Sequence, residues 1–345
     1  MPVRKKPKRA DYLSFDALTL EAICNRYGIA YANVRYFSPI LVRENECLLV
    51  DSKSETARKA FIYLDDESLF LKEVPWYCRT EELMSAKYEF VDFLTRREFP
   101  CAQLVSTIDG SPNVDMGDFA FELWKVVPGA SYAYRPEEQY SAGKTLGNLH
   151  VLSSQFPVTR EPESVPQLAL GFIDLVRSAR GDSRFFVHEL ASLEAKTRTI
   201  CSELQLPAST MDQVITVHGN YTPWNLAFKD GEVVGVFDFD NVAVDSPMHD
   251  VAEGLLGFCA MNYEGTSTNF AAEPPRSFNW NGVERFIAGY ATVRDLAADD
   301  LRILRGYLKL VWIEFACLGM VRGDYGLEVL DQIEDLMLDI DRGTL

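Results

Sequence analysis

The stretch Val217-His218-Gly219-Asn220-Tyr221-Thr222-Pro223-Trp224-Asn225, with Val236-Phe237-Asp238-Phe239-Asp240 after it, is the most informative part of the chain. Apolar runs predict three short strands here, separated by the polar loop and by a Lys-Asp-Gly-Glu turn. Asn225 closes the loop, and Asp238 ends the third strand. Hard divalent ions prefer oxygen ligands from carboxylates and amide carbonyls, so the pattern predicts that Asn225 and Asp238 share one Mg²⁺. Purely local roles, as a loop cap and a turn residue, are the alternative for these two side chains.

Length and composition restrict the classes of protein to which the chain can belong. With 345 residues, of which 47% are hydrophobic, the chain can bury a large core and is expected to form two lobes. No apolar run approaches the roughly 20 residues of a membrane helix, so no membrane partner is expected. Residues 1–12 form a basic tail, either solvated or partner-binding, which lacks the apolar core of a signal peptide.

Charge and cysteine usage narrow the partners and the compartment. The formal net charge of −17 disfavours nucleic-acid binding, which needs a surplus of Lys and Arg. An acidic protein can attract a cationic substrate, although solubility alone also explains the charge. Seven scattered Cys without a CxxC motif indicate reduced thiols and a cytoplasmic location. The four His residues lack metal-ligand spacing, which disfavours a zinc site.

The patterns of apolar residues change near 128–132, where Pro-Gly-Ala-Ser interrupts both strand and helix signals. Before this point we expect a helix at 15–27 and then a small mixed lobe. The predicted elements of this lobe are three strands at 47–50, 60–64 and 69–74, a helix at 81–97 and two further strands at 102–108 and 119–127. After it the chain is mainly helical; the predicted helices are 137–154, 167–177, 183–203, 250–262, 283–292, 299–321 and 325–340.

The motif residues resemble one known family position for position. His218-Gly219-Asn220, Asn225, Asp238 and the segment 245–252 (Asp-Ser-Pro-Met-His-Asp-Val-Ala) resemble the aminoglycoside phosphotransferase/choline kinase family, which has the protein-kinase-like fold. The resemblance extends from about residue 40 to 255, with a helical C-terminus of the expected size. It implies a bilobal α+β fold, with a nucleotide-binding N-terminal lobe at 13–129 and a mainly helical catalytic and acceptor-binding C-terminal lobe at 130–345. The implied activity is a kinase that uses ATP or GTP with Mg²⁺ to phosphorylate an alcohol hydroxyl of a small molecule.

The resemblance also assigns residues in the small lobe. Lys72, on its third strand, matches the lysine that contacts the ATP phosphates. The expected partner of Lys72 is a glutamate on the following helix; Glu89 fits best and Glu82 is the alternative. The segment 119–129 resembles the strand and linker that hold the nucleotide base through backbone hydrogen bonds. Those contacts would come from Leu123, Trp124 and Lys125.

A solvated lysine and an ordinary edge strand are the alternatives for these small-lobe features. The segment Leu146-Gly147-Asn148-Leu149-His150 resembles a further family helix, for which a structural role is expected.

Two features depart from the family pattern. The phosphate-covering loop expected at 51–58 contains no glycine. Asn220 stands where the family has the aspartate that accepts the proton of the substrate hydroxyl, and a carboxamide has negligible basicity. Positioning and Mg²⁺ electrostatics do most of the work in phosphoryl transfer, whereas general-base catalysis contributes about 10²- to 10⁴-fold. We therefore expect Mg-ATP binding with strongly reduced turnover, and expect His218 and Asp250 to brace the loop.

Three explanations fit Asn220: a laboratory Asp→Asn substitution, a natural enzyme with slow chemistry, and a pseudokinase that serves as a binding module. The rival functions are accordingly a catalytically silent nucleotide sensor or scaffold, and a kinase for a peptide or protein hydroxyl. The net charge favours a cationic acceptor such as an aminoglycoside or an amino alcohol. Acidic residues of the C-terminal part are candidate contacts for such an acceptor, or else a solvated face: Glu253, Glu314, Asp331, Glu334 and Asp335. Nothing in the sequence indicates an oligomeric state.

Overall fold

The computed structural model describes residues 17–31, 36–39, 58–65, 67–158, 160–161, 165–180, 184–204, 214–263 and 273–343. The chain forms two compact units. Unit 1 comprises Met1–Ser131, Ala227–Lys229 and Val234–Asp240, and unit 2 comprises Tyr132–Leu226, Asp230–Val233 and Asn241–Leu345. The first change of unit thus falls two residues beyond the division placed at 129/130. The chain returns to unit 1 twice, at Ala227–Lys229 and at Val234–Asp240, on either side of the Lys-Asp-Gly-Glu turn. The sequence assigned both segments to the second lobe.

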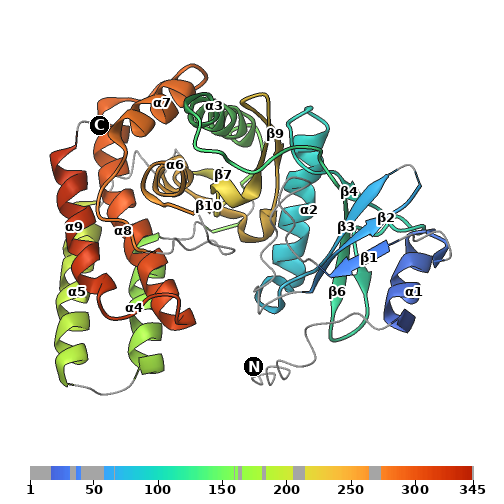
Figure 1. The fold of residues 1–345 in the computed structure, drawn as a ribbon, viewed down its shortest axis with the longest axis horizontal. Coiled ribbons are helices and arrows are strands. Elements are labelled where there is room, and N and C mark those ends of the chain that lie inside the picture. Colours follow the sequence, from blue (N-terminus) through green and yellow to red (C-terminus); the bar gives the residue numbers. More distant parts are fainter. Residues whose placement is uncertain are drawn as a thin grey trace. The chain divides into compact units, whose positions relative to one another are not determined.

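Unit 1 contains an antiparallel sheet and two helices (Figure 1). Its elements are α1 (Ala17–Arg26), β1 (Tyr36–Pro39), β2 (Lys59–Tyr63), β3 (Ser68–Glu73), η3 (Trp76–Cys78), α2 (Glu81–Thr95), β4 (Leu104–Val105), β5 (Val114–Asp115) and β6 (Ala120–Lys125). The strand order is β1-β2-β3-β6-β4, and β5 also pairs with β6. In the register of β3 and β6, Lys72 lies opposite Glu122, which brings a cation and a carboxylate together on neighbouring strands.

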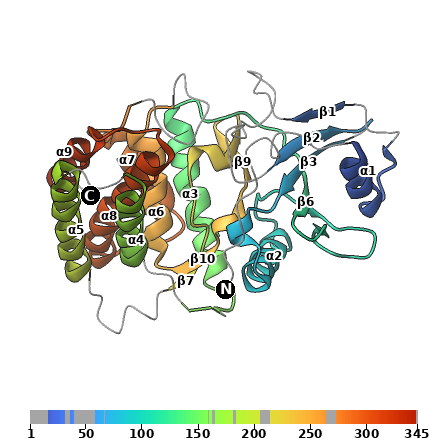
Figure 2. The same cartoon turned by 90° about the horizontal axis from the view of Figure 1, so that it is seen from below.

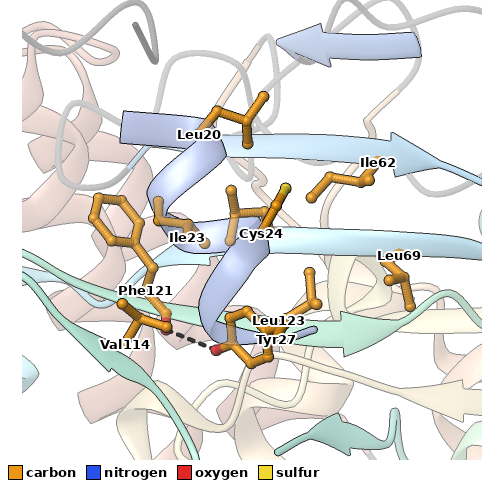
Figure 3. Packing of buried hydrophobic residues seen from close by; sticks show 10 residues of the cluster. Leu20, Ile23, Cys24, Tyr27, Ile62, Leu69, Val114, Phe121 and Leu123 are labelled. Carbon is orange, nitrogen blue, oxygen red and sulfur yellow. Dashed lines mark hydrogen bonds between the residues drawn. The ribbon is translucent and has the colours of Figure 1, made fainter. Parts of the chain in front are cut away.

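Helix α1 covers one face of this sheet through a narrow apolar stripe. Leu20, Ile23, Cys24 and Tyr27 recur at the i, i+3, i+4, i+7 spacing that places side chains on one helix face, and all four are buried. Figure 3 shows them packed with sheet residues such as Phe121, whose carbonyl oxygen accepts a hydrogen bond of 3.0 Å from the Tyr27 hydroxyl. The hydroxyl of Tyr27 is therefore satisfied in an otherwise apolar layer.

Helix α2 begins at a conventional cap and carries one unexpected residue. The Thr80 hydroxyl accepts the backbone N–H of Leu83 at 3.2 Å, which satisfies a donor of the first turn. The buried residues of the helix are Lys87, Phe90, Val91 and Leu94. A lysine therefore occupies a position of the buried face that helical periodicity assigns to an apolar residue.

Unit 2 is mainly helical. Its helices and strands are α3 (Pro136–Ser153), α4 (Val165–Arg180), α5 (Arg184–Glu203), β7 (Ile215–Val217), η5 (Pro223–Asn225), β10 (Ala243–Asp245), α6 (Pro247–Leu255), η7 (Leu256–Ala260), α7 (Trp280–Ala291), α8 (Ala298–Arg322) and α9 (Val329–Arg342). Figures 1 and 2 show α4, α5, α8 and α9 packed side by side. Helix α3 packs closely on α7, since a Cβ at Gly143 would collide with the backbone carbonyl of Phe286. β7 pairs antiparallel with β10, which places Val217, just before the 218–225 loop, opposite Ala243 at the start of β10.

The hairpin β8 (Leu226–Lys229) and β9 (Glu232–Val236) follows the loop, and the short η6 (Phe239–Asn241) follows the hairpin. The three strands predicted around the motif are therefore present, and the first of them pairs with β10 rather than with the hairpin. The predicted α+β class is confirmed. Across the described ranges, no helix is long and apolar enough to cross a membrane.

Some predicted elements differ from the structure. The strand expected at 102–108 is reduced to Leu104–Val105, and the short β5 was missed. The helix expected at 250–262 begins earlier, at Pro247, where Ser246 caps it and Pro occupies the first helical turn. Its last turn, Leu256–Ala260, is a π-helix. The basic tail 1–12, the strand expected at 47–50 and all of the glycine-free loop except Arg58 lie outside the described residues.

Candidate active site

Asp250 of α6 fixes the loop that starts at His218. Its Oδ2 accepts the backbone N–H of His218 and its Oδ1 accepts that of Gly219, both at 2.8 Å. Gly219 has a φ of +71°, and a Cβ added there would collide with the carbonyl of Asn241. A left-handed conformation and close backbone approach together require glycine at this position. The structure thus provides the bracing role that was predicted for Asp250.

His150 of α3 completes the support of this carboxylate. Its Nε2 lies 3.1 Å from Asp250 Oδ2, and its Nδ1 lies 2.8 Å from the hydroxyl of Tyr290. Burial lowers the pKa of His150. Burial acts to raise the pKa of Asp250, but the hydrogen bond from His150 and the nearby histidines outweigh it and hold this pKa below its usual value. Asp250 is thus a buried anion whose oxygens are used to hold the backbone of the loop.

The side chain of His218 is fully buried and stacks edge-to-face with Tyr221 at 5.9 Å between ring centroids. A buried imidazole cannot contact a substrate in this arrangement, so His218 belongs to the supporting structure of the loop. Asn220, two positions later, is half-buried and follows directly on the braced backbone.

Asn220 and Asn225 are brought together by the loop. The backbone carbonyl of Asn220 accepts hydrogen bonds from the Nδ2 of Asn225 at 2.8 Å and from the backbone N–H of Thr222 at 3.0 Å. Asn225 is 6% exposed and lies at the end of η5, immediately before β8. Because the amide NH₂ is used within the loop, Oδ1 is the atom of Asn225 that is suited to a cation.

A second set of charged side chains on α6 also contacts the loop. Glu253 of α6 accepts the backbone N–H of Tyr221 at 3.0 Å, and its other oxygen lies 3.7 Å from Nε2 of His249. Nδ1 of His249 lies 3.1 Å from Oδ2 of Asp245. Burial alone would lower the pKa of His249, but Glu253, Asp245 and Glu314 raise it to about 10. His249 is therefore a cation at neutral pH beside Asp245, while burial raises the pKa of its other neighbour, Glu253, to about 8.

In unit 1, Lys72 forms ion pairs with two aspartates that follow β9. It pairs with Oδ1 of Asp238 and lies 2.6 Å from Oδ2 of Asp240. The Asp238 side chain is 28% exposed, whereas that of Asp240 is 5% exposed. Asp238 also has a φ of +62°, in the left-handed region that residues other than glycine adopt uncommonly and aspartate more often than most. The structure thus joins two of the predicted site residues, Lys72 and Asp238.

The predicted pair of Lys72 and Glu89 is not formed. Glu89 is exposed on α2 and accepts a hydrogen bond of 2.7 Å from the hydroxyl of Ser85. The buried face of α2 presents Lys87 instead, two positions earlier, and helical geometry points residues two apart in different directions. The reserve choice, Glu82, is exposed in the first turn of the same helix.

The predicted base contacts from Leu123, Trp124 and Lys125 meet a constraint. These residues lie on β6, which has β3 on one side and β4 on the other. The backbone N–H of Lys125 donates to the carbonyl of Gln103 at 2.8 Å. The backbone N–H of Val126 likewise donates to the carbonyl of Ser68 at 3.1 Å, so neither of these two N–H groups is available to a nucleotide base.

Three of the five acidic residues suggested as acceptor contacts, Glu253, Glu334 and Asp335, form two groups. Glu334 pairs with Lys196, and Asp335 lies 2.5 Å from Arg276; all four side chains are largely exposed. Glu253 belongs to the buried group around His249. The surface pairs are typical of a solvated helix face, so Glu253 is the member connected to the loop.

Sequence reasoning missed Lys87, Glu122 and the ion-pairing role of Asp240. The available signal was the position of Lys87 at the spacing of Phe90, Val91 and Leu94 on an apolar helix face. A charge at such a position is expected to find a buried partner.

Each unit offers side chains whose chemistry suits a divalent metal ion or phosphate. Mg²⁺ is usually held by one or two protein oxygens together with phosphate and water oxygens. Asp238 offers a partly exposed carboxylate in unit 1, and Asn225 offers an amide oxygen in unit 2. Lys72 offers a cation for phosphate oxygens. Within the described part of the chain, no cluster of three or more His, Cys, Asp or Glu side chains could hold a metal ion by itself.

Comparisons with known proteins identify a family of phosphotransferases. Residues 50–294 match the model of the phosphotransferase enzyme family. The chain is 28% identical over 198 residues to a homoserine kinase of Phenylobacterium zucineum (strain HLK1), which covers 56% of this chain and 53% of that enzyme. It therefore spans about half the length of this relative. A homoserine kinase of Gluconobacter oxydans (strain 621H) is 23% identical over 289 residues, which cover 84% of this chain and 82% of that enzyme.

A solved structure shows the same fold. An amicoumacin kinase in complex with AMP-PNP and Ca²⁺ superposes with a TM-score of 0.62 and 17% sequence identity, over 95% of this chain and 93% of that chain. The predicted protein-kinase-like fold is thereby confirmed.

Proposed function

Because the chain belongs to the phosphotransferase enzyme family, we propose that it transfers the terminal phosphoryl group of ATP or GTP to an alcohol hydroxyl of a small molecule. Lys72 would contact the phosphates, Asp238 and Asn225 would hold Mg²⁺, and the side chain of Asn220 would orient the acceptor hydroxyl. When bound with the nucleotide, Mg²⁺ supplies neutralisation of the charge on the phosphate oxygens.

The observation that carries this proposal is the ion pair between Lys72 and Asp238. A phosphate-binding cation and a metal-binding carboxylate need each other's charge while no nucleotide is bound. Asp238 is the more exposed of the two aspartates that hold Lys72, so it is the one free to exchange the lysine for a metal ion. The pair thus keeps both groups charged and adjacent before the nucleotide arrives.

The role of Asn220 follows from its chemistry. Its amide can hold the acceptor hydroxyl by a hydrogen bond but cannot take up the proton. The brace of Asp250 on the preceding backbone supports this positioning role, because it fixes where residue 220 begins. Turnover is expected to be about 10²- to 10⁴-fold below that of a form with a carboxylate at this position.

The acceptor class is supported by two independent observations. The relatives with the sequence matches above are homoserine kinases, whose named acceptor is an amino acid alcohol. The net charge of −17 also favours an acceptor that carries an ammonium group. We therefore propose an amino alcohol as the acceptor, ahead of an aminoglycoside.

The test is a comparison of the chain that carries Asn220, here called the unsubstituted chain, with the Asn220→Asp variant. ADP or GDP release is measured with Mg²⁺ and homoserine, ethanolamine or an aminoglycoside as acceptor, and calorimetry measures nucleotide binding. The proposal expects both proteins to bind Mg-nucleotide and the variant to phosphorylate at least one acceptor faster. It is overturned if neither protein binds a nucleotide.

Asn220 favours a second candidate function, a nucleotide-binding module without phosphotransfer. This candidate retains Lys72, Asp238 and Asn225 but needs no proton acceptor. If Asn220→Asp binds Mg-nucleotide as tightly as the unsubstituted chain and still phosphorylates none of the acceptors, the module is the better description.

A further inference from the structure

We infer that Lys87 is a positioning residue for the nucleotide site: from α2 it holds Asp240 and Glu122, and so leaves Lys72 and Asp238 available for phosphate and metal. This inference rests on the function proposed above. The residue group that carries it, here called the five-charge cluster, lies within unit 1 and consists of Lys72, Lys87, Glu122, Asp238 and Asp240.

Asp240 is the bridge between the two lysines. Its Oδ2 lies 2.6 Å from the amine of Lys72, and its Oδ1 lies 3.0 Å from the amine of Lys87. Lys87 also pairs with Oε1 of Glu122, which lies opposite Lys72 in the sheet register. Lys87 is therefore placed between the two carboxylates that could otherwise compete for Lys72.

Burial separates the fixed members of the cluster from the exchangeable one. The side chains of Lys87, Glu122 and Asp240 are 3%, 0% and 5% exposed, whereas Asp238 is 28% exposed. Buried charges need partners, so the three buried groups are expected to stay together. Lys72 is 7% exposed, so Asp238 is the most exposed member of the cluster and the one most accessible to an arriving metal ion.

Further hydrogen bonds fix Glu122. Its Oε1 accepts the hydroxyl of Tyr88 at 2.7 Å, and its Oε2 accepts the indole N–H of Trp124 at 3.2 Å. The hydroxyl of Tyr88 in turn accepts the Nδ2 of Asn113 at 3.1 Å. Glu122 is thus immobilised from three sides, and the orientation of Lys87 follows from it.

The charge balance explains why the helix carries a cation. The cluster has two lysines and three carboxylates, which leaves one uncompensated negative charge. A glutamate at position 87 would raise the excess to three, and a neutral residue would raise it to two. In both cases Lys72 would be the only cation for Glu122 and both aspartates, and phosphate would compete poorly for it.

The experiment uses the full chain and two ligands, Mg-AMP-PNP and adenosine. Adenosine carries no phosphate and so reports on the base site alone. We expect Lys87→Met to weaken Mg-AMP-PNP binding by about 10- to 100-fold, as is usual for groups that orient ligands, and to leave adenosine binding unchanged. Lys87→Arg should restore most of the affinity for Mg-AMP-PNP. The matched control is Arg96→Met, which removes an exposed cation at the end of the same helix and should change neither affinity.

A measurement without nucleotide keeps the inference separate from the proposed function. Hydrogen exchange of the 237–241 backbone should become faster in Lys87→Met than in the unsubstituted chain, and should stay unchanged in Arg96→Met. If the unsubstituted chain binds no nucleotide, the proposed function fails, and this exchange rate still decides the role of Lys87. The inference is overturned by unchanged exchange at 237–241, by undiminished Mg-AMP-PNP binding in Lys87→Met, or by equal loss of both ligands that Lys87→Arg does not rescue.

Discussion

The carboxylate of Asp250 accepts the backbone N–H of His218 at 2.8 Å, although the two residues lie 32 positions apart. The same side chain also accepts the N–H of Gly219, so one buried anion fixes two successive peptide groups. The half-buried Asn220 follows directly. The position of the residue that would meet the acceptor hydroxyl is therefore set from α6, and not by the loop alone.

Asp250→Asn tests this support. The substitution replaces one acceptor oxygen by an NH₂ group, which leaves one of the two backbone N–H donors facing another donor. We expect the free energy of unfolding to fall by about 1–3 kcal/mol, measured by urea denaturation. The exposed Asp295→Asn serves as the control and should change it by less than about 0.5 kcal/mol. Equal stability of the two variants would contradict the bracing role.

Gly219 and Gly171 form a matched pair of glycines. Gly219→Ala forces a left-handed φ on alanine and a collision with Asn241, so it should lower the free energy of unfolding by at least about 1 kcal/mol. Gly171 lies in α4 with open space around its Cα, so Gly171→Ala should stabilise the protein by about 0.5–1 kcal/mol. Thermal unfolding of both variants checks the opposite signs, and a tolerated Gly219→Ala would refute the argument.

The buried cation at His249 predicts a pH dependence of stability. Its pKa is raised from 6.5 to about 10 by Glu253, Asp245 and Glu314. A raised pKa means that the stabilisation is complete below pH 6.5 and is lost as pH rises through 10. Over this window each pH unit removes up to about 1.4 kcal/mol from the free energy of unfolding.

Urea denaturation at several pH values, on the unsubstituted chain and on His249→Gln, measures this contribution. The variant should lose most of the slope between pH 7 and 10. His188→Gln, at an exposed histidine, should retain it. An unchanged slope in His249→Gln would show that another group carries the dependence.

Lys72 pairs with Asp238 and not with Glu89, and this predicts how substitutions of Lys72 and Glu89 change nucleotide affinity. Lys72→Met removes the cation for the phosphates and should weaken Mg-AMP-PNP binding by at least about tenfold, measured by calorimetry. Glu89→Gln changes an exposed side chain bonded to Ser85 and should alter the affinity by less than about twofold. A large loss in Glu89→Gln would restore the pairing that the sequence suggested.

The family, the fold and most helices could be predicted because they depend on local patterns. The spacing of His218, Asn225 and Asp238 identified the motif, and the comparison with known proteins finds that family. The spacing of Leu18, Leu20, Ile23 and Cys24 predicted a helix at 15–27, since helical periodicity is a property of neighbours in sequence; α1 is present, but Leu18 is exposed whereas the other three are buried. The short strands β4 and β5 were misjudged because pairing with β6, and not their own residues, makes them strands.

What the sequence determined by itself is the set of groups that can do chemistry, because residue type and spacing are written in it. Which charges meet was decided only by the tertiary structure. Lys72 finds Asp238 across 166 positions, and Lys87 takes the buried place on α2 for which Glu89 was the expected residue. The physical reason is that the strength of an ion pair depends on distance and burial in space, and neither quantity is encoded by separation along the chain.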